Sequence, residues 1–309
     1  MTDIGYLLPT RESVMGGAPD PAPLLALAGR AEALAYRSVW VGDSIVAKPR
    51  HEPLTILAAA AARTSQVQLG TAVLLPALRD PVVLAHLVTT VDLLSAGRLI
   101  LGIGMAADTP ANRAEFAAVG VPYERRGNRM DENLDVCRAL WTTEAVTRTG
   151  DLYPLDDVQM LPAPHTTGGP PIWAAGGGPI SIRRAAERYD GWFPIGANQE
   201  KFVAGVAQVT ELAEAAGRPR PTIAMYLTVS VDDDQAKAES TLEDFLGDYY
   251  SAPGAAVRKM QATVAGPLDA VAEGIASWAS AGADHLVLRF VGNHERHLEQ
   301  LASTVADLA

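Results

Sequence analysis

The chain has 309 residues, 48% of them hydrophobic, and a formal net charge of −11 at pH 7. This composition supports a large buried core, and the acidic balance without a basic stripe argues against nucleic acid or an anionic membrane as partner. The single cysteine, Cys137, cannot form an internal disulfide and falls on the apolar side of a predicted helix, so we expect a core thiol in a protein of the reducing cytoplasm. The N-terminal residues lack a secretory signal, and no apolar run is long enough to span a bilayer.

Short β-branched runs alternate along the chain with longer Ala/Leu-rich runs of helical spacing, which is typical of repeated βα units. The runs predicted to be strands are 4–8, 38–41, 67–75, 99–104, 171–175, 191–195, 222–231 and 285–290. The helices predicted between and after them are 23–36, 53–63, 81–94, 128–142, 181–189, 199–216, 267–281 and 295–308, with an acidic helical stretch after residue 231.

Residues 146–164 interrupt this alternation. A turn at Thr149-Gly150-Asp151 lies between two short segments suited to extended structure. We expect a hairpin over one end of the fold.

Eight parallel strands can close into a barrel, and closure removes the exposed sheet edges. The sequence therefore predicts an α/β fold, a (β/α)8 TIM barrel with insertions, as a single domain over residues 1–309. An open, doubly wound sheet is the alternative. It is less favoured because no strand-to-helix turn carries a full Gly-x-Gly-x-x-Gly.

The active site of such a barrel lies at the C-terminal ends of its strands. The residues predicted there are mostly small and apolar, which suits a flat aromatic ligand better than a metal or a sugar. They are Leu8-Pro9-Thr10, Gly42-Asp43-Ser44, Ala72-Val73-Leu74, Gly104-Met105-Ala106, Ala175-Gly176-Gly177-Gly178, Ile195-Gly196, Tyr226 and Arg289-Phe290.

A run of three glycines, Gly176-Gly177-Gly178, stands between a predicted strand and a predicted helix. Glycine lets the backbone approach a ligand closely, and a helix N-terminus offers free N–H groups to a phosphate. Arg183 and Arg184 could add positive charge. A tight turn that binds nothing is the alternative. Gly102-Ile103-Gly104 is a weaker signal that gives a ligand room at the mouth.

Candidate acid–base groups follow the first two strands. Asp43 is either a helix cap or a polar contact to a bound ring, and His51 and Glu12 are candidate proton donors. Arg11, Tyr226 and Arg289 are candidate substrate contacts.

Other motifs point away from metal and nucleophile chemistry. The His294-x-x-His297 pair is predicted to lie on a solvated helix face without a third metal ligand, so no metal site is expected. The sequence has no serine elbow, P-loop, HExxH or CxxC motif, which favours a cofactor-driven enzyme.

Several of these segments together resemble the luciferase-like monooxygenase family. The similarity runs from the first strand to about Gly191 and weakens after it. The segments that carry it are Val39–Asp43, Leu69–Pro76, Arg79-Asp80-Pro81, Asp92–Arg98, Leu101–Gly104, Gly120-Val121-Pro122, Glu124-Arg125-Arg126, Pro170-Pro171-Ile172 and Gly176-Gly177.

The resemblance implies a barrel that holds FMN or the deazaflavin F420 with its ring at the mouth. The ring would lie against a bulge after the third strand, which often has a non-proline cis peptide and matches Ala72-Val73. Asp43 matches the position that contacts the polar edge of the ring in the F420 branch, and the segment Gly176–Gly178 matches the phosphate-side loop. The cofactor contacts expected in full are Asp43, Ala72, Val73, Gly104, Met105, Ala175, Gly176, Gly177 and Gly178.

Two positions depart from the family pattern. Ser44 replaces a histidine common in the F420 branch, and Met105 lies near an arginine position of the luciferase branch. F420-dependent hydride transfer to or from a small organic substrate is favoured. The alternatives are an FMN monooxygenase supplied by a separate reductase and a barrel that binds a flavin-like ligand without turnover. The resemblance also implies a homodimer.

Overall fold

Eight parallel strands form a closed ring, and the computed structural model describes residues 1–308 of the chain. Neighbouring strands pair around the ring, and the last pairs with the first. The ring order is β1 (Asp3–Leu7), β2 (Ser38–Val41), β3 (Gln68–Thr71), β4 (Leu99–Ile103), β7 (Ile172–Ala175), β8 (Gly191–Phe193), β9 (Thr222–Val231) and β11 (His285–Phe290). The predicted (β/α)8 barrel is confirmed, and the open sheet is excluded.

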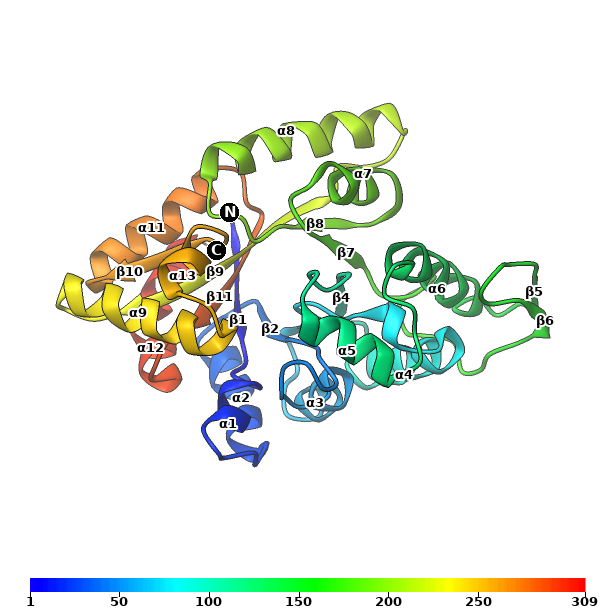
Figure 1. Cartoon of the computed structure of the whole chain (residues 1–309), viewed down its shortest axis with the longest axis horizontal. Coiled ribbons are helices and arrows are strands. Elements are labelled where there is room, and N and C mark those ends of the chain that lie inside the picture. The colour runs from blue at the N-terminus through cyan, green and yellow to red at the C-terminus, as the bar shows by residue number, and fades with distance from the viewer. Residues whose placement is uncertain (309) are drawn as a thin grey trace.

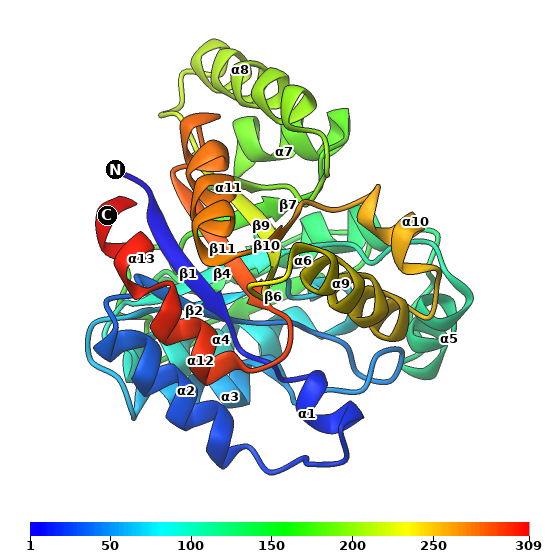
Figure 2. The same cartoon turned by 90° about the vertical axis from the view of Figure 1, so that its left-hand side faces the viewer.

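Helices surround the barrel and bury their apolar faces against it (Figures 1 and 2). Several of these helices begin with a proline in the first turn, a side chain that caps the N-terminus, or both. In α4, Asp80 accepts hydrogen bonds from the backbone N–H groups of Val82 and Val83. The surrounding helices are α2 (Ala22–Ala33), α3 (Pro53–Ala61), α4 (Pro81–Leu94), α6 (Arg126–Leu140), α7 (Pro179–Arg188), α8 (Gln199–Ala215), α11 (Leu268–Ser280), α12 (His294–Gln300) and α13 (Ala302–Leu308). In residues 1–308, none of the helices combines the length and apolarity needed to cross a bilayer.

Aromatic side chains fill the inside of the barrel. Trp40 lies 5.2 Å from Trp173 and 5.4 Å from Phe193 between ring centroids, and His285 packs on both tryptophans. The interior is a packed core, as in other barrels of eight strands, so a ligand has room only at the mouth.

Insertions gather at the C-terminal end of the barrel. Figure 2 shows α1 (Glu12–Met15), α5 (Pro110–Ala118), α9 (Gln235–Tyr250) and α10 (Gly254–Arg258) on the side of the molecule away from the chain termini. Of these, the sequence predicted only α9, as an acidic helical stretch. It also missed η1 (Pro76–Leu78) and β10 (Thr263–Gly266), a parallel strand that extends the sheet beside the end of β9.

The predicted hairpin is present as β5 (Val146–Arg148) and β6 (Leu155–Val158), which pair antiparallel. It is held beside α6, where Glu132 accepts the backbone N–H groups of Leu152 and Tyr153 (Figure 1). The hairpin therefore extends the outside of the molecule at α6.

Two further details concern buried side chains. Cys137 is buried on α6 as predicted, and its thiol donates to the Pro81 carbonyl at 3.4 Å. The prediction that His294 and His297 lie on a solvated face is wrong. His297 is buried against Phe290, and His294 Nδ1 is 2.9 Å from the Tyr6 hydroxyl, because α12 packs on β1 and β11.

Candidate active site

A cavity opens at the C-terminal end of the barrel, where the prediction placed the site. Its floor is apolar and comes from the ends of three strands, β1, β7 and β8, and the segment after β3, while its polar wall comes from the loops and helices above. The lining residues are Leu7, Asp43, Ser44, Lys48, Arg50, Ala72, Val73, Leu75, Ala106, Ala107, Asn112, Glu115, Ala175, Phe193, Pro194, Ile195, Tyr226, Tyr249 and Tyr250.

A bulge after β3 forms one side of this cavity. The predicted strand to residue 75 ends at Thr71, the Ala72–Val73 peptide is cis, and pairing resumes only as a bridge between Leu74 and Ile103. The cis peptide that the family resemblance implied is thus present. Both residues of the bulge face the cavity.

The two glycines of β4 make room for that bulge. A Cβ at Gly102 would collide with the carbonyl oxygen of Thr71, and a Cβ at Gly104 would lie 2.6 Å from Cγ2 of Val73. The Gly-x-Gly pair therefore accommodates the protein's own chain, and Gly104 supports the cavity from behind.

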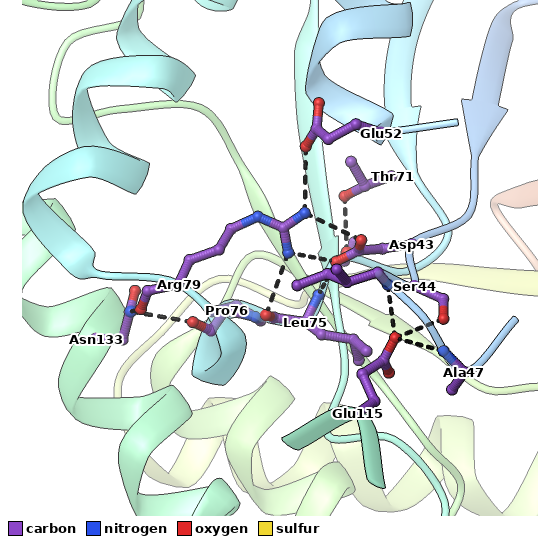
Figure 3. Close-up of polar contacts among 12 residues, drawn as sticks. Asp43, Ser44, Ala47, Glu52, Thr71, Leu75, Pro76, Arg79, Glu115 and Asn133 are labelled. Atoms are coloured by element: carbon purple, nitrogen blue, oxygen red, sulfur yellow. Dashed lines mark hydrogen bonds and ion pairs between the residues drawn. The ribbon is translucent and has the colours of Figure 1, made fainter. Parts of the chain in front are cut away.

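Asp43 lies at the end of β2 with its carboxylate buried (Figure 3). Arg79 donates hydrogen bonds to both carboxylate oxygens, at 2.6 and 3.0 Å, and the Leu75 N–H donates to Oδ2 at 2.9 Å. Burial alone would lower the pKa of Arg79, but the charges and hydrogen bonds of Asp43 and Glu52 together outweigh it and raise that pKa. The pair fixes the segment after β3, where Asn133 of α6 also donates to the carbonyls of Pro76 and Arg79.

Glu115 of α5 organises the loop after β2 (Figure 3). Its Oε1 accepts from the Ser44 hydroxyl at 2.7 Å and from the backbone N–H groups of Ile45, Val46 and Ala47 at 2.6 to 3.1 Å. Burial acts to raise the pKa of Glu115, but these hydrogen bonds outweigh it and the pKa is lowered. Oε2 is buried without a partner. A carboxylate in the cavity wall therefore keeps one oxygen free.

The predicted glycine loop leads from β7 into α7. Gly176 has a φ of +109°, and a Cβ added there would collide with the Ser181 side chain. A Cβ added at Gly177 or Gly178 would have nothing within 4 Å. Helix α7 has no side-chain cap, so the loop and the free N–H groups of its first turn are open to a ligand phosphate. Of the two arginines expected to help, Arg184 is paired with Asp131 at 2.7 Å.

Tyrosines form the wall opposite the bulge. Tyr226 ends in the cavity, and burial raises its pKa. Burial also acts to raise the pKa of Tyr250, but Arg289 and Lys48 outweigh it and lower that pKa. Arg289 is buried behind this wall, where it donates to Thr228, Gln261 and Tyr250. It therefore holds the wall in place and does not line the cavity.

The three predicted glycines lie outside the cavity lining, which reaches their segment only at Ala175, and so do four of the other predicted residues. His51 has both ring nitrogens against backbone carbonyls, of Thr10 at 3.3 Å and Pro19 at 2.7 Å, which favours a structural role. Glu12 and Arg11 lie beside the tyrosine wall, and burial raises the pKa of Glu12. Met105 faces a separate hollow, where Arg126 donates to its carbonyl at 3.0 Å.

The sequence reasoning missed the polar residues of the lining: Lys48, Arg50, Asn112, Glu115, Tyr249 and Tyr250. All of them come from the excursions that follow β2, β4 and β9. The available signal was the unusual length of these excursions, because long βα loops of a barrel cover its active site.

A closed barrel with an apolar mouth, a bulge after its third strand and an open phosphate-side turn is the architecture of cofactor-binding (β/α)8 enzymes. Residues 2–309 match the family model described as luciferase-like monooxygenase. The chain belongs to the luciferase-like monooxygenase family, a family of oxidoreductases.

Similar proteins fall in the same group. The chain is 31% identical to the F420-dependent glucose-6-phosphate dehydrogenase of Amycolatopsis mediterranei, over 92% of this chain and 93% of that protein. A solved F420-dependent secondary alcohol dehydrogenase with an F420-acetone adduct has a TM-score of 0.85 at 21% identity, covering 100% and 99% of the two chains. The oxygenating constituent of 3,6-diketocamphane monooxygenase from Pseudomonas putida, in complex with FMN, has a TM-score of 0.78 at 18% identity, covering 99% and 98%.

Proposed function

We propose that this protein is an F420-dependent oxidoreductase acting on a small organic substrate. The observation that carries the proposal is the cavity between the Ala72–Val73 bulge and Ala175, the residue before the glycine loop, in a chain 31% identical over nearly its whole length to an F420-dependent enzyme. When bound, F420 accepts or donates a hydride.

The residues present fit such a cofactor. Ala72, Val73 and Ala175 form an apolar surface on which a fused ring could lie. Gly177 and Gly178, with the uncapped first turn of α7, would receive the phosphate.

Asp43 would contact the polar edge of the ring. A carboxylate has about four acceptor positions, and three at Asp43 are used by Arg79 and the Leu75 N–H. The remaining position on Oδ1 is left for the ring. Arg79 thereby holds Asp43 in a single orientation.

Glu115 is our candidate for the group that accepts a proton from the substrate. Its pKa is lowered, so it is a carboxylate at neutral pH, and Oε2 has no other partner. This role replaces the ones expected for His51 and Glu12, since neither of these lines the cavity.

Equilibrium titration of the purified protein with F420 and with FMN tests the proposal. We expect saturable F420 binding with a Kd below about 100 µM, and at least tenfold weaker binding by Gly178→Ala. The matched control is Gly29→Ala, because a Cβ at either glycine has no neighbour within 4 Å. Failure of F420 to bind would refute the proposal.

An FMN-dependent monooxygenase is the second candidate. It is supported by the description of the family and by the FMN complex among the structures of similar fold. Binding of FMN in place of F420, with oxygen uptake when reduced FMN and a substrate are supplied, would favour this candidate, and a separate reductase would then be its partner.

Two further expectations are part of the proposal. A homodimer is supported by the exposed Val83, Leu87 and Leu94 on α4, which give this helix an apolar outer side. A cytoplasmic location is supported by the single, buried thiol.

A further inference from the structure

Three cationic side chains gather on one side of the cavity mouth. Lys48 and Arg50, from the loop after β2, line the cavity itself. Arg11, from the loop after β1, lies flat on the ring of Tyr249 with its guanidinium carbon 4.2 Å from the ring centroid. The Lys48 ammonium lies 5.4 Å from the Tyr250 ring centroid, so both tyrosines of α9 back the cluster.

Among the described residues, these cations lack ion-pair partners, although Arg11 is buried and Lys48 and Arg50 are half-buried. In the described part of the chain, residues 1–308, none of the three forms an ion pair with a carboxylate. Nε and Nη1 of Arg11 and Nε of Arg50 are buried without any hydrogen-bond partner, although Arg50 donates through Nη2 to the Tyr249 hydroxyl at 3.3 Å. Burying unpaired charge is costly, so this arrangement is suited to an anion.

The nearby carboxylates form no ion pair with the cluster, although the charge of Glu115 acts on Lys48. Glu115 has its Oε1 occupied by Ser44 and the loop backbone. Burial raises the pKa of Glu12 and so disfavours its charged form. Burial lowers the pKa of Lys48, and the charges of Arg50 and Arg11 add to this effect, whereas Tyr250 and Glu115 act against it.

The position of the cluster separates it from the phosphate-side loop. In the ring order, β1 and β7 lie on opposite sides of the barrel, because three strands stand between them in either direction. The cationic cluster follows β1 and β2, whereas the glycine loop follows β7. An anion on the cluster would thus lie across the mouth from the proposed cofactor phosphate, with the ring between them.

We propose that Lys48, Arg50 and Arg11 bind an anionic group of the substrate, a carboxylate or a phosphate, and so select small organic acids or phosphate esters. The inference rests on the proposed function for the placement of the ring. The substrate's anionic end would dock on the cluster, and its reactive carbon would face the bulge side of the cavity.

Isothermal titration calorimetry with inorganic phosphate and with acetate tests the cluster directly, without turnover. We expect saturable binding to the native protein and a loss of about tenfold or more in the Lys48→Gln/Arg50→Gln double variant, since charge-assisted hydrogen bonds are removed. Lys48→Arg keeps the charge and should retain binding. Arg63→Gln, which removes an exposed arginine after α3, is the control for non-specific effects. Equal, weak heats in all variants would overturn the proposal.

The same titration in the presence of saturating F420 shows whether the cluster binds the anionic group of the substrate or the phosphate of the cofactor. Phosphate should still bind, and the double variant should keep its F420 affinity within about twofold. Competition between phosphate and F420, together with weak F420 binding by the double variant, would assign the cluster to the cofactor and overturn the substrate role. If the protein binds no F420 at all, the phosphate titration still reports on the cluster, so the two proposals fail separately. Urea unfolding midpoints verify that each variant is folded.

Discussion

At the scale of single residues, the site depends on side chains that fix one another. Asp43 and Arg79 form a bidentate ion pair, in which the Asp43 side chain is 1% exposed and the Arg79 side chain 13% exposed. Glu52 adds a contact to Arg79 at 3.2 Å. Removing the charge of Arg79 leaves Asp43 buried without an ionic partner, and removing that of Asp43 leaves Arg79 only the more exposed Glu52.

We predict that Asp43→Asn lowers the free energy of unfolding by about 3–5 kcal/mol, the usual effect of breaking a buried ion pair from one side. Urea denaturation at pH 7 measures the change. Arg30→Gln is the control, because its pair with Glu299 is about half exposed and should matter little. A change no larger than that of the control would show that Arg79 does not need the charge of Asp43.

The sequence located some of these residues but not their partners. Asp43 could be assigned to the mouth because it follows a short strand, and strand ends are readable from a period of two. Glu115 is 71 residues from its partner Ser44 and lies on an insertion. No local pattern indicates which excursion folds back over which strand, so contacts of this kind were beyond prediction.

At the scale of elements, the bulge after β3 and the glycines of β4 act as one unit. The Thr71 hydroxyl donates to the Gly102 carbonyl at 2.8 Å, and the chain of β3 passes directly over Gly102. A side chain at that position has to displace the bulge that lines the cavity.

Gly102→Ala is expected to lower the free energy of unfolding by about 1–3 kcal/mol through overpacking and to weaken cofactor binding as well. Urea unfolding and the F420 titration measure the two effects. Gly29→Ala, in α2 with open space around it, should instead stabilise the protein by up to about 1 kcal/mol. Unchanged stability and affinity in Gly102→Ala would show that the bulge is not constrained by β4.

The elements of the repeat were predictable because hydrophobic spacing distinguishes strands from amphipathic helices. The eight ring strands were therefore all found, although β3 is shorter than predicted because the bulge breaks the pairing at Thr71. Helices α1 and α10 have only 4 and 5 residues, too few for a periodic signal. β10 pairs only with the far end of β9, which depends on the tertiary fold.

At the scale of the whole molecule, the buried His285 and the half-buried His294 link stability to pH. Burial lowers the pKa of His285 to about 3 and that of His294 to about 4, both from 6.5. The unfolded chain therefore takes up these protons at a higher pH than the folded protein.

We expect the contribution of these histidines to the free energy of unfolding to be complete above pH 6.5. It should be lost as the pH falls from 6.5 towards 4, by at most about 1.4 kcal/mol per pH unit for each histidine. Urea unfolding at pH 7.5, 6 and 5 measures the slope. In the His294→Gln variant, the free energy of unfolding should change less steeply with pH. The carboxylates titrate in both proteins, so their effect cancels in the comparison. Identical slopes would contradict the prediction.

Association should depend on the outer side of α4. Light scattering is expected to show a dimer for the native protein and a monomer for Leu87→Asp, because a charge in the middle of an apolar interface is costly. Val203→Asp on α8 is the matched control, since Val203 is 48% exposed and Leu87 43% exposed. If both variants remain dimers, α4 is not the interface.

The burial of Cys137 also has a practical consequence for following this enzyme in solution. The only sulfhydryl of the chain lies beneath α4, and burial raises its pKa, so maleimide dyes should not react with it while the protein is folded. A cysteine introduced on α9 would then carry a fluorescent label alone, without prior removal of the native one. Movements of this helix over the mouth during turnover would become visible by fluorescence, in a protein otherwise unaltered.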